Sequence, residues 1–487
     1  MDNYFLAIDI GASSGRHILG NKASEKLLMK EIYRFENGMV QRGGHLCWNL
    51  DVLFNHIKEG MKKCRAEGVT PVSIGIDTWG CDFVLVDAEK KLLGDSVAYR
   101  DARTNGVPEK VATIISDGEL YDATGLQKLP FNTIYQLMAV KEQAPEILDK
   151  AAHFLMVPDY FNFLLTGEIT NEYTCASTTE LVNVDSMEWD YALIEKLGLP
   201  TRIFKPVTKP GTVIGRLLPE IVSEVGFTCD VVAPCTHDTG SAVAALPVCS
   251  ANCGNAPQTN AVHQANVAPQ GGKSDPLYIS SGTWSLLGTE LMSPEKSEKA
   301  RLLNYTNEGG YNGRYRFLKN IMGLWMIQSI RKELMKKEGR KIGFDELDKE
   351  AEKADIASIV DCNSSVFLAP PSMIEAVQEE CRKNGSKVPE TAGELAAVVY
   401  DSLATCYAKA VNQLFEIFGK KYTDLYIIGG GSKSVLLNKK TAEKTGLTVH
   451  TGPVEATAAG NLVVQMITAG VFKSLDDARR CISVSGL

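Results

Sequence analysis

The segment Tyr4–Gly20, YFLAIDIGASSGRHILG, contains two apolar runs that flank the small, polar stretch Gly11–Gly15. Such runs predict a buried hairpin, and a turn rich in Gly and Ser leaves backbone N–H groups and hydroxyls free to bind a phosphate. Asp9 lies beside this turn, where a carboxylate would repel a phosphate unless a divalent cation lay between them. We therefore interpret Asp9 as a ligand that holds Mg²⁺ through water. An ordinary hairpin with a glycine turn would have the same pattern.

The length and composition of the chain limit its class. With 487 residues it exceeds what one core usually supports, so two domains are expected. No run approaches the roughly 18 apolar residues of a membrane span, and the N-terminus has no basic region typical of a signal peptide, so we expect a cytoplasmic protein. A net charge of −8 argues against nucleic acid or an anionic membrane as the main partner.

The twelve cysteines are scattered through the chain, and a protein of this size does not depend on disulfides, so we expect reduced thiols. Cys249 and Cys253 form a close pair, with His263 ten residues further on. This spacing matches no common zinc site and lacks a fourth ligand, so zinc is not expected.

Two further stretches place polar residues where predicted strands end. In PVSIGIDTWGCDFVLVD (71–87), Asp77, Thr78 and Asp82 separate two buried strands, at the edge where open α/β sheets bind ligands. The alternative is an acidic turn without function. Further on, a strand over Asp230–Pro234 leads to His237, Asp238 and Thr239 and then to a helix of small residues. Asp238 and Thr239 either face a ligand or only cap the helix, and both interpretations stay open.

The second half of the chain begins with residues 248–272, which contain no charged side chain and predict a loop or inserted excursion at a domain boundary. Tyr278–Gly288 then repeats the strand, Ser/Gly/Thr turn and strand of the N-terminus, which indicates an internal duplication. Two such domains would bring both turns to one cleft and hold one nucleotide from both sides.

Three more elements are predicted in this half. We expect a helix from Tyr315 to Leu334, in which Asn320 and Gln328 would lie about 12 Å apart along the axis and about 80° around it. These two amides either contact different parts of a ligand pair or are simply exposed. Thr391 and Glu394 predict a capping box that opens a helix to Phe418. The glycine turn 429–431 follows a predicted strand and offers backbone against which a nucleotide can lie.

Taken together and in order, eight groups of motifs resemble the FGGY family of carbohydrate kinases. They are DIGASSGR (9–16), GIDTWGCDFVL (75–85), AYRDARTNG (98–106), LPFNTIYQL (129–137), THDTGSAV (236–243), SSGTWSLLG (280–288), TNEGG with RYRFLKNIMGLW (306–325), and IIGGGS with GPVEATAAGN (427–461). The 248–272 segment is longer than the corresponding connection usually is in that family.

The resemblance implies an α/β protein of two actin-like ribonuclease-H-type domains with a cleft between them. Residues 1–246 would form a sugar-binding domain with the first phosphate hairpin, and residues 247–487 a nucleotide-binding domain that begins with the inserted loop 248–272. It implies Mg²⁺-dependent transfer of a phosphoryl group from ATP to L-rhamnulose, giving L-rhamnulose 1-phosphate, with another ketopentose or deoxyketohexose such as L-fuculose or L-xylulose as the alternative. The expected partners are sugar and ATP, without nucleic acid or membrane, in a monomer or small homo-oligomer.

Matching positions imply which residues bind each substrate. Contacts with ATP are expected from Ala12, Ser13, Ser14, Gly15, Arg16, Thr283, Gln328 and Gly430. Contacts with the sugar are expected from Gly80, His237, Asp238, Thr239 and Asn320, with Asp238 as the proton acceptor. Two other classes share parts of this pattern: a chaperone ATPase, which would need a peptide-binding domain, and a sugar sensor, which would need neither Asp238 nor both phosphate turns.

Overall fold

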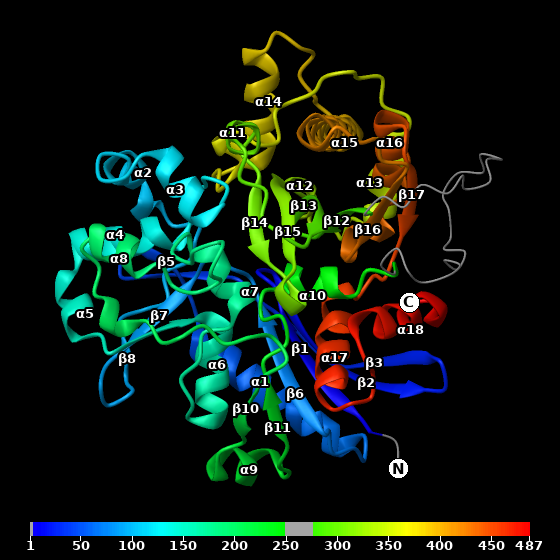
Figure 1. The fold of residues 1–487 in the computed structure, drawn as a ribbon. Helices are drawn as coiled ribbons and strands as arrows, with labels where there is room; N and C mark the ends of the chain where they lie inside the picture. Colours follow the sequence, from blue (N-terminus) through cyan, green and yellow to red (C-terminus); the bar gives the residue numbers. More distant parts are fainter. Residues whose placement is uncertain (1–2, 249–275) are drawn as a thin grey trace. The chain divides into compact units, whose positions relative to one another are not determined.

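A computed structural model describes residues 3–248 and 276–487 and contains two six-stranded sheets (Figure 1). The first consists, in order, of β10 (Val213–Arg216), β11 (Asp230–Val232), β6 (Ser73–Thr78), β1 (Phe5–Ile10), β2 (Ser14–Ala23) and β3 (Lys26–Glu36). The second consists of β14 (Thr306–Gly309), β15 (Tyr315–Met322), β13 (Trp284–Leu291), β12 (Leu277–Ser281), β16 (Asp424–Ile428) and β17 (Thr448–Thr451).

Both sheets are built around the same strand arrangement. An antiparallel hairpin, β1–β2 or β12–β13, supplies the central strand, and the other side of that strand pairs in parallel with a later strand, β6 or β16. A further parallel strand, β11 or β17, follows on that side. The predicted hairpins and the predicted duplication are therefore confirmed.

The chain forms two compact units, and neither is a continuous half of it. The first unit comprises described residues 3–248, 290–318 and 455–487, and the second comprises 276–289 and 319–454. A domain division at residue 246 stays a prediction. The excursion predicted for 248–272 lies outside the described residues, apart from Val248.

Helices cover both faces of the first sheet. His17 of β2 contacts α1 (Leu50–Ala66), whose Ile57 carbonyl lies 3.1 Å from the imidazole Nε2. Gly20 of the same strand faces Leu462 of α17 (Ala456–Thr468). Residues three positions apart on a strand point to opposite faces, so α1 and α17 lie on opposite sides of this sheet. Its central strands β1 and β6 are fully buried.

Smaller elements complete the first unit. Two short sheets consist of β4 (Met39–Arg42) with β5 (His45–Trp48), and of β8 (Leu92–Leu93), β7 (Phe83–Val86) and β9 (His153–Met156). The remaining helices are α2 (Val107–Val111), α3 (Asp117–Thr124), α4 (Thr133–Gln143), α5 (Pro145–Lys150), α6 (Val157–Thr166), α7 (Tyr173–Ala176), α8 (Tyr191–Lys196), α9 (Pro219–Val225), α10 (Asp238–Ala244), α11 (Glu298–Leu302) and α18 (Leu475–Ser485).

The helices of the second unit are α12 (Trp325–Glu338), α13 (Phe344–Ala351), α14 (Met373–Lys383), α15 (Ala392–Phe418) and α16 (Val435–Thr445). The prediction for α15 is confirmed at both ends. Thr391 and Glu394 form the capping box, and Gly419 ends the helix with φ of 65°, a conformation that glycine adopts without strain.

The helix predicted over Tyr315–Leu334 is wrong in its first part. Tyr315–Met322 is the strand β15, and α12 begins only at Trp325. Most of β15 is buried, so an apolar run of this length is compatible with a strand as well as with a helix. Asn320 therefore lies on a strand and Gln328 on a helix, and the helical spacing expected between them does not apply. Within residues 3–248 and 276–487, none of the helices has the length and hydropathy needed to cross a membrane.

Candidate active site

The first predicted site residues lie where β1, β2 and β6 meet. Asp9 is paired with Arg16 across the β1–β2 hairpin and with Asp77 across the parallel β1–β6 pair. The turn between β1 and β2 holds Ala12 and Ser13 and is closed by the Gly11 N–H, which donates to the Ser14 carbonyl at 2.9 Å. Two carboxylates thus lie side by side at the ends of two parallel strands, next to the predicted phosphate turn.

Asp77 is fully buried, and only one of its oxygens has a partner. The Asn461 amide of α17 donates to Oδ2 at 2.6 Å, whereas Oδ1 accepts no hydrogen bond from any residue the structure describes. Burial and the neighbouring charge of Asp9 raise the pKa of Asp77 well above its ordinary value. A buried carboxylate oxygen without a donor is a position that a cation or its hydration water would stabilise.

Arg16 is held by two carboxylates. Its Nε lies 3.2 Å from Asp9 Oδ2, and its Nη1 donates to Glu455, the residue before α17. These charges raise the pKa of Arg16, with Asp9 as the main cause. Burial raises the pKa of Asp9, and the charge of Arg16 opposes this effect.

His237 and Asp238 lie at the start of α10, beside the end of β6. The Thr78 N–H donates to the Thr236 carbonyl at 2.9 Å, which joins this segment to the strand that carries Asp77. The helix begins at Asp238, and His237 is its N-cap residue without a capping side chain. Asp238 Oδ1 accepts a hydrogen bond from the adjacent Thr239 N–H, which is not the bond that an N-cap side chain makes. This geometry argues against a helix-cap role for Asp238, and its predicted contact with a ligand stays a prediction.

The pKa of Asp238 is raised well above the ordinary value of an aspartate. Burial, followed by the charge of Asp9, raises the pKa of Asp238 to about 7, although hydrogen bonds from Thr239 and the charge of Arg316 act in the opposite direction. A carboxylate with a pKa near the working pH both accepts and releases a proton readily.

Arg316 fixes the protonation of His237. This arginine of β15 is completely buried, and its Nη2 lies 3.0 Å from His237 Nδ1. A guanidinium can only donate, so Nδ1 accepts and the ring proton resides on Nε2, which lies 3.4 Å from Asp238 Oδ1. Burial, and then the charge of Arg316, lower the pKa of His237 well below its usual value, so the ring stays neutral. Glu308 lies 3.0 Å from Arg316 Nη1 and balances its charge.

Gly80 borders the same place. A Cβ at this position would lie 3.0 Å from Thr178 Oγ1 and 3.3 Å from His237 Nε2, so only glycine leaves this side of the imidazole open. Asp82, two residues on, has a different role. Its carboxylate accepts hydrogen bonds from the indoles of Trp48 (2.6 Å) and Trp79 (2.9 Å), and also from Gln136 and Tyr99. The acidic stretch thus divides into Asp77, which keeps one oxygen without a donor, and Asp82, whose carboxylate is held by hydrogen bonds within the protein.

The second unit contains the other four predicted site residues. Thr283 lies in the β12–β13 turn, which the Gly282 N–H closes by donating to the Trp284 carbonyl at 2.8 Å. Gly429–Gly431 passes next to this hairpin, because a Cβ at Gly431 would lie 1.9 Å from Ser281 Oγ. A Cβ at Gly430 would meet no atom within 4 Å, so backbone is open to a ligand there. Asn320 on β15 and Gln328 on α12 are partly exposed.

The sequence interpretation missed Arg316, Glu308, Asn461 and Glu455, although each contacts a predicted site residue. A signal was present for Arg316, since a charged residue between Tyr315 and Phe317 in a buried strand needs a partner. Asn461 gave a weaker signal as an amide within a helix of small and apolar residues. The binding and catalytic roles that the sequence predicted for the site residues stay predictions.

A directly coordinated metal ion is not favoured by this arrangement. Among the residues that the structure describes, no group of three or more His, Cys, Asp and Glu side chains is placed to hold one. The unpartnered Oδ1 of Asp77, beside Asp9 at the ends of two paired strands, instead fits a divalent cation held through water.

Comparison with known proteins decides the family. Residues 4–245 match the FGGY family of carbohydrate kinases, N-terminal domain, and residues 277–469 match the C-terminal domain of the same family. The chain belongs to this family. It is therefore a sugar kinase, and the expected α/β fold of two actin-like domains is confirmed.

Similar proteins extend over nearly the whole chain. A rhamnulokinase of Halalkalibacterium halodurans is 46% identical over 480 residues, which cover 99% of this chain and 97% of the relative. A rhamnulokinase of Klebsiella pneumoniae is 39% identical, covering 98% and 92%. In structure, the chain is similar to a ligand-bound xylulose kinase of Lactobacillus acidophilus, with a TM-score of 0.77, 15% identity and coverage of 98% and 92%. Plasmodium falciparum glycerol kinase with ADP gives a TM-score of 0.73 at 14% identity, with coverage of 99% and 92%.

Proposed function

We propose that this FGGY kinase phosphorylates L-rhamnulose with ATP, giving L-rhamnulose 1-phosphate and ADP. The observation that carries the choice of substrate is the 46% identity to a rhamnulokinase over 99% of the chain. The chemistry is supported by Asp238, a carboxylate with a pKa of about 7 next to a neutral imidazole that donates from Nε2.

Asp238 acts as the proton acceptor. As the O1 hydroxyl of the sugar forms its bond to the γ-phosphorus of ATP, the bond from that phosphorus to the bridging oxygen of ADP breaks, and the hydroxyl proton passes to the Asp238 carboxylate. Positioning of the hydroxyl supplies most of the rate, since phosphoryl transfer demands little covalent chemistry from the protein. His237 contributes by donating from Nε2 to a sugar oxygen, and Gly80 leaves the space that this oxygen occupies.

The phosphates and the cation are assigned to the β1–β2 turn. Backbone N–H groups and hydroxyls of Ala12, Ser13, Ser14 and Gly15 and the guanidinium of Arg16 bind phosphate oxygens, while Thr283, Gln328 and Gly430 bind ATP from the second unit. Asp9 and Asp77 would hold Mg²⁺ through water. When bound, Mg²⁺ neutralises charge on the phosphates.

We also propose a domain division, a cellular compartment and an oligomeric state for the enzyme. Residues 1–246 would form the sugar-binding domain and residues 247–487 the nucleotide-binding domain, with Asn320 reaching the sugar. Segments 290–318 and 455–487 of the second stretch pack with the first unit and would extend the sugar-binding domain. The enzyme works in the cytoplasm as a monomer or small homo-oligomer, and its partners are the sugar and ATP.

A coupled assay of ADP release tests the substrate. The panel contains L-rhamnulose, L-fuculose, L-xylulose, glycerol and a reaction without sugar, and kcat/KM should be highest for L-rhamnulose. Another ketose with a clearly higher value would replace the proposed substrate. ADP release that is independent of sugar would indicate an ATPase of another class, and sugar binding without turnover would indicate a sensor.

A further inference from the structure

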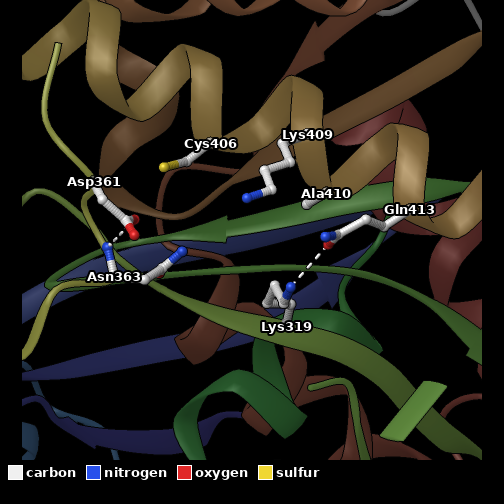
Figure 2. A pocket seen from close by; sticks show the side chains of 7 residues that line it. All are labelled: Lys319, Asp361, Asn363, Cys406, Lys409, Ala410 and Gln413. Carbon is white, nitrogen blue, oxygen red and sulfur yellow. Dashed lines mark hydrogen bonds between the residues drawn. The ribbon is translucent and has the colours of Figure 1, made fainter. Parts of the chain in front are cut away.

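A small cavity in the second unit brings a thiol together with two lysines. Its volume is about 60 Å³, and α15 forms one wall while β15 and the segment before α14 form the others (Figure 2). The polar side chains that line it are those of Lys319, Asp361, Asn363, Cys406, Lys409 and Gln413. None of these residues belongs to the proposed catalytic site.

Helical spacing places three of these side chains on one face of α15. Cys406, Lys409 and Gln413 are three and four positions apart, so all three face the cavity. Lys319 of β15 donates to Gln413 Oε1 at 2.8 Å and thereby places a second ammonium group opposite Lys409 (Figure 2). Burial, and then the charge of Lys409, lower the pKa of Lys319 to about 8, so the two ammonium groups lie close enough to repel each other.

Cys406 has a second cysteine as its hydrogen-bond partner. A hydrogen bond links the Cys362 and Cys406 thiols, and the backbone N–H of Cys362 also donates to the Cys406 sulfur. Cys362 is fully buried, whereas Cys406 is partly exposed and lines the cavity. The hydrogen bond from the Cys362 thiol is the main cause that lowers the pKa of Cys406, and Lys409 acts in the same direction, while burial and Asp361 oppose them.

Cys81 in the first unit provides a comparison within the same protein. It is also partly exposed, but its charged neighbours are Asp82, Glu308 and Glu180, and burial raises its pKa well above the ordinary value. The other eight described cysteines are buried. Reactive thiols are partly exposed and lie in positive surroundings, and Cys406 alone among the ten described cysteines combines partial exposure with neighbouring lysines.

We propose that Cys406 is a modification site at which small electrophiles and hydroperoxides react, and that the buried Cys362 converts its oxidised form into a disulfide. In the first step the Cys406 thiolate attacks one oxygen of a hydroperoxide, so that sulfur is oxidised to a sulfenic acid and the O–O bond is reduced, with water or an alcohol leaving after protonation. In the second step the Cys362 sulfur attacks the Cys406 sulfur, and the hydroxyl leaves as water with the Cys362 proton. The disulfide would link α15 covalently to the segment that precedes α14.

Alkylation of the unmodified protein tests the first part. Iodoacetamide labelling, resolved by peptide mass spectrometry at pH 7.5, should modify Cys406 at least about tenfold faster than Cys81, since the thiolate is the reacting form. Lys409→Gln should slow the labelling of Cys406 roughly threefold, because it removes one of the charges that stabilise the thiolate. The control Lys336→Gln, at an exposed position of α12, should leave the labelling rate of Cys406 unchanged. Labelling of Cys81 at the rate of Cys406 or faster would overturn the proposal.

Oxidation tests the second part. Stoichiometric hydrogen peroxide followed by peptide mapping without reductant should give a Cys362–Cys406 disulfide that dithiothreitol removes. In Cys362→Ser, dimedone should instead trap a sulfenic acid on Cys406, while Cys381→Ser, which changes another buried thiol of the second unit, should leave the disulfide in place. The absence of the disulfide from the oxidised wild type, or no gain of dimedone adduct in Cys362→Ser, would refute the role of Cys362.

Discussion

Gly460 of α17 controls the position of the proposed base, and Gly460→Ala should therefore impair both stability and turnover. A Cβ at Gly460 would lie 1.7 Å from the Ser241 carbonyl oxygen of α10. An ordinary carbon–oxygen contact needs about 3.3 Å, so the two helices must separate by about 1.6 Å. Both clashing groups are fixed by helical backbone, and no rotamer change relieves the overlap.

The expected magnitudes follow from this displacement. Overpacking between rigid elements costs about 1–3 kcal/mol, and we expect the upper end, or a fall in Tm of about 5 °C for a unit of roughly 300 residues. Asp238 precedes Ser241 by three residues, within the same turn of α10, so it moves with the carbonyl. A shift of about 1 Å in a reacting group reduces rates by about 100-fold, and we expect kcat to fall by at least that factor.

Thermal unfolding and saturating kinetics of the purified variant provide the measurement. The matched control is Gly118→Ala in α3, where the added Cβ meets nothing within 4 Å. This control should keep its kcat and gain up to about 1 kcal/mol from helix propensity. A Gly460→Ala enzyme with the Tm and kcat of wild type would refute the close packing of α10 on α17 and its role in placing Asp238.

Four further outcomes are expected. Asp238→Asn should lower kcat by about 10²- to 10⁴-fold with little change in the KM for ATP, and near-normal turnover would remove Asp238 from the mechanism. In wild type, kcat/KM should rise about tenfold per pH unit as the pH approaches about 7 and then level off, because Asp238 with its raised pKa must lose its proton. A rise in kcat/KM that is centred near pH 4 would contradict this assignment. Arg316→Met should raise the KM for the sugar about tenfold without changing the KM for ATP, because His237 Nδ1 loses its donor, and Arg316→Lys should recover part of this loss. An equal effect on both KM values would indicate that Arg316 has only a structural role. EDTA should abolish turnover and added Mg²⁺ should restore it, and full activity in EDTA would exclude the predicted cation.

Local patterns predicted the elements whose signals are contained in a few adjacent residues. The capping box at Thr391 and both glycine-containing hairpins are examples, because their hydrogen bonds join neighbours in the sequence. The Tyr315–Leu334 helix failed because a buried strand and a buried helix share the same apolar composition, and only pairing in the sheet distinguishes them. Contacts of His237 with Arg316 and of Asp77 with Asn461 join residues 79 and 384 positions apart, so no local pattern contains them.

The place of α17 in the chain has a consequence for biosynthesis. Its Asn461 and Gln465 donate to the carbonyls of Gly75 and Leu6, so the last helices to be synthesised cover strands that are among the first. At about 5–20 residues per second, a ribosome needs about 20 to 80 s to add the intervening residues. Over that interval β1 and β6 emerge without the helix that buries one of their faces. Nascent chains of this kinase should therefore depend on chaperones that bind apolar strands until translation reaches α17.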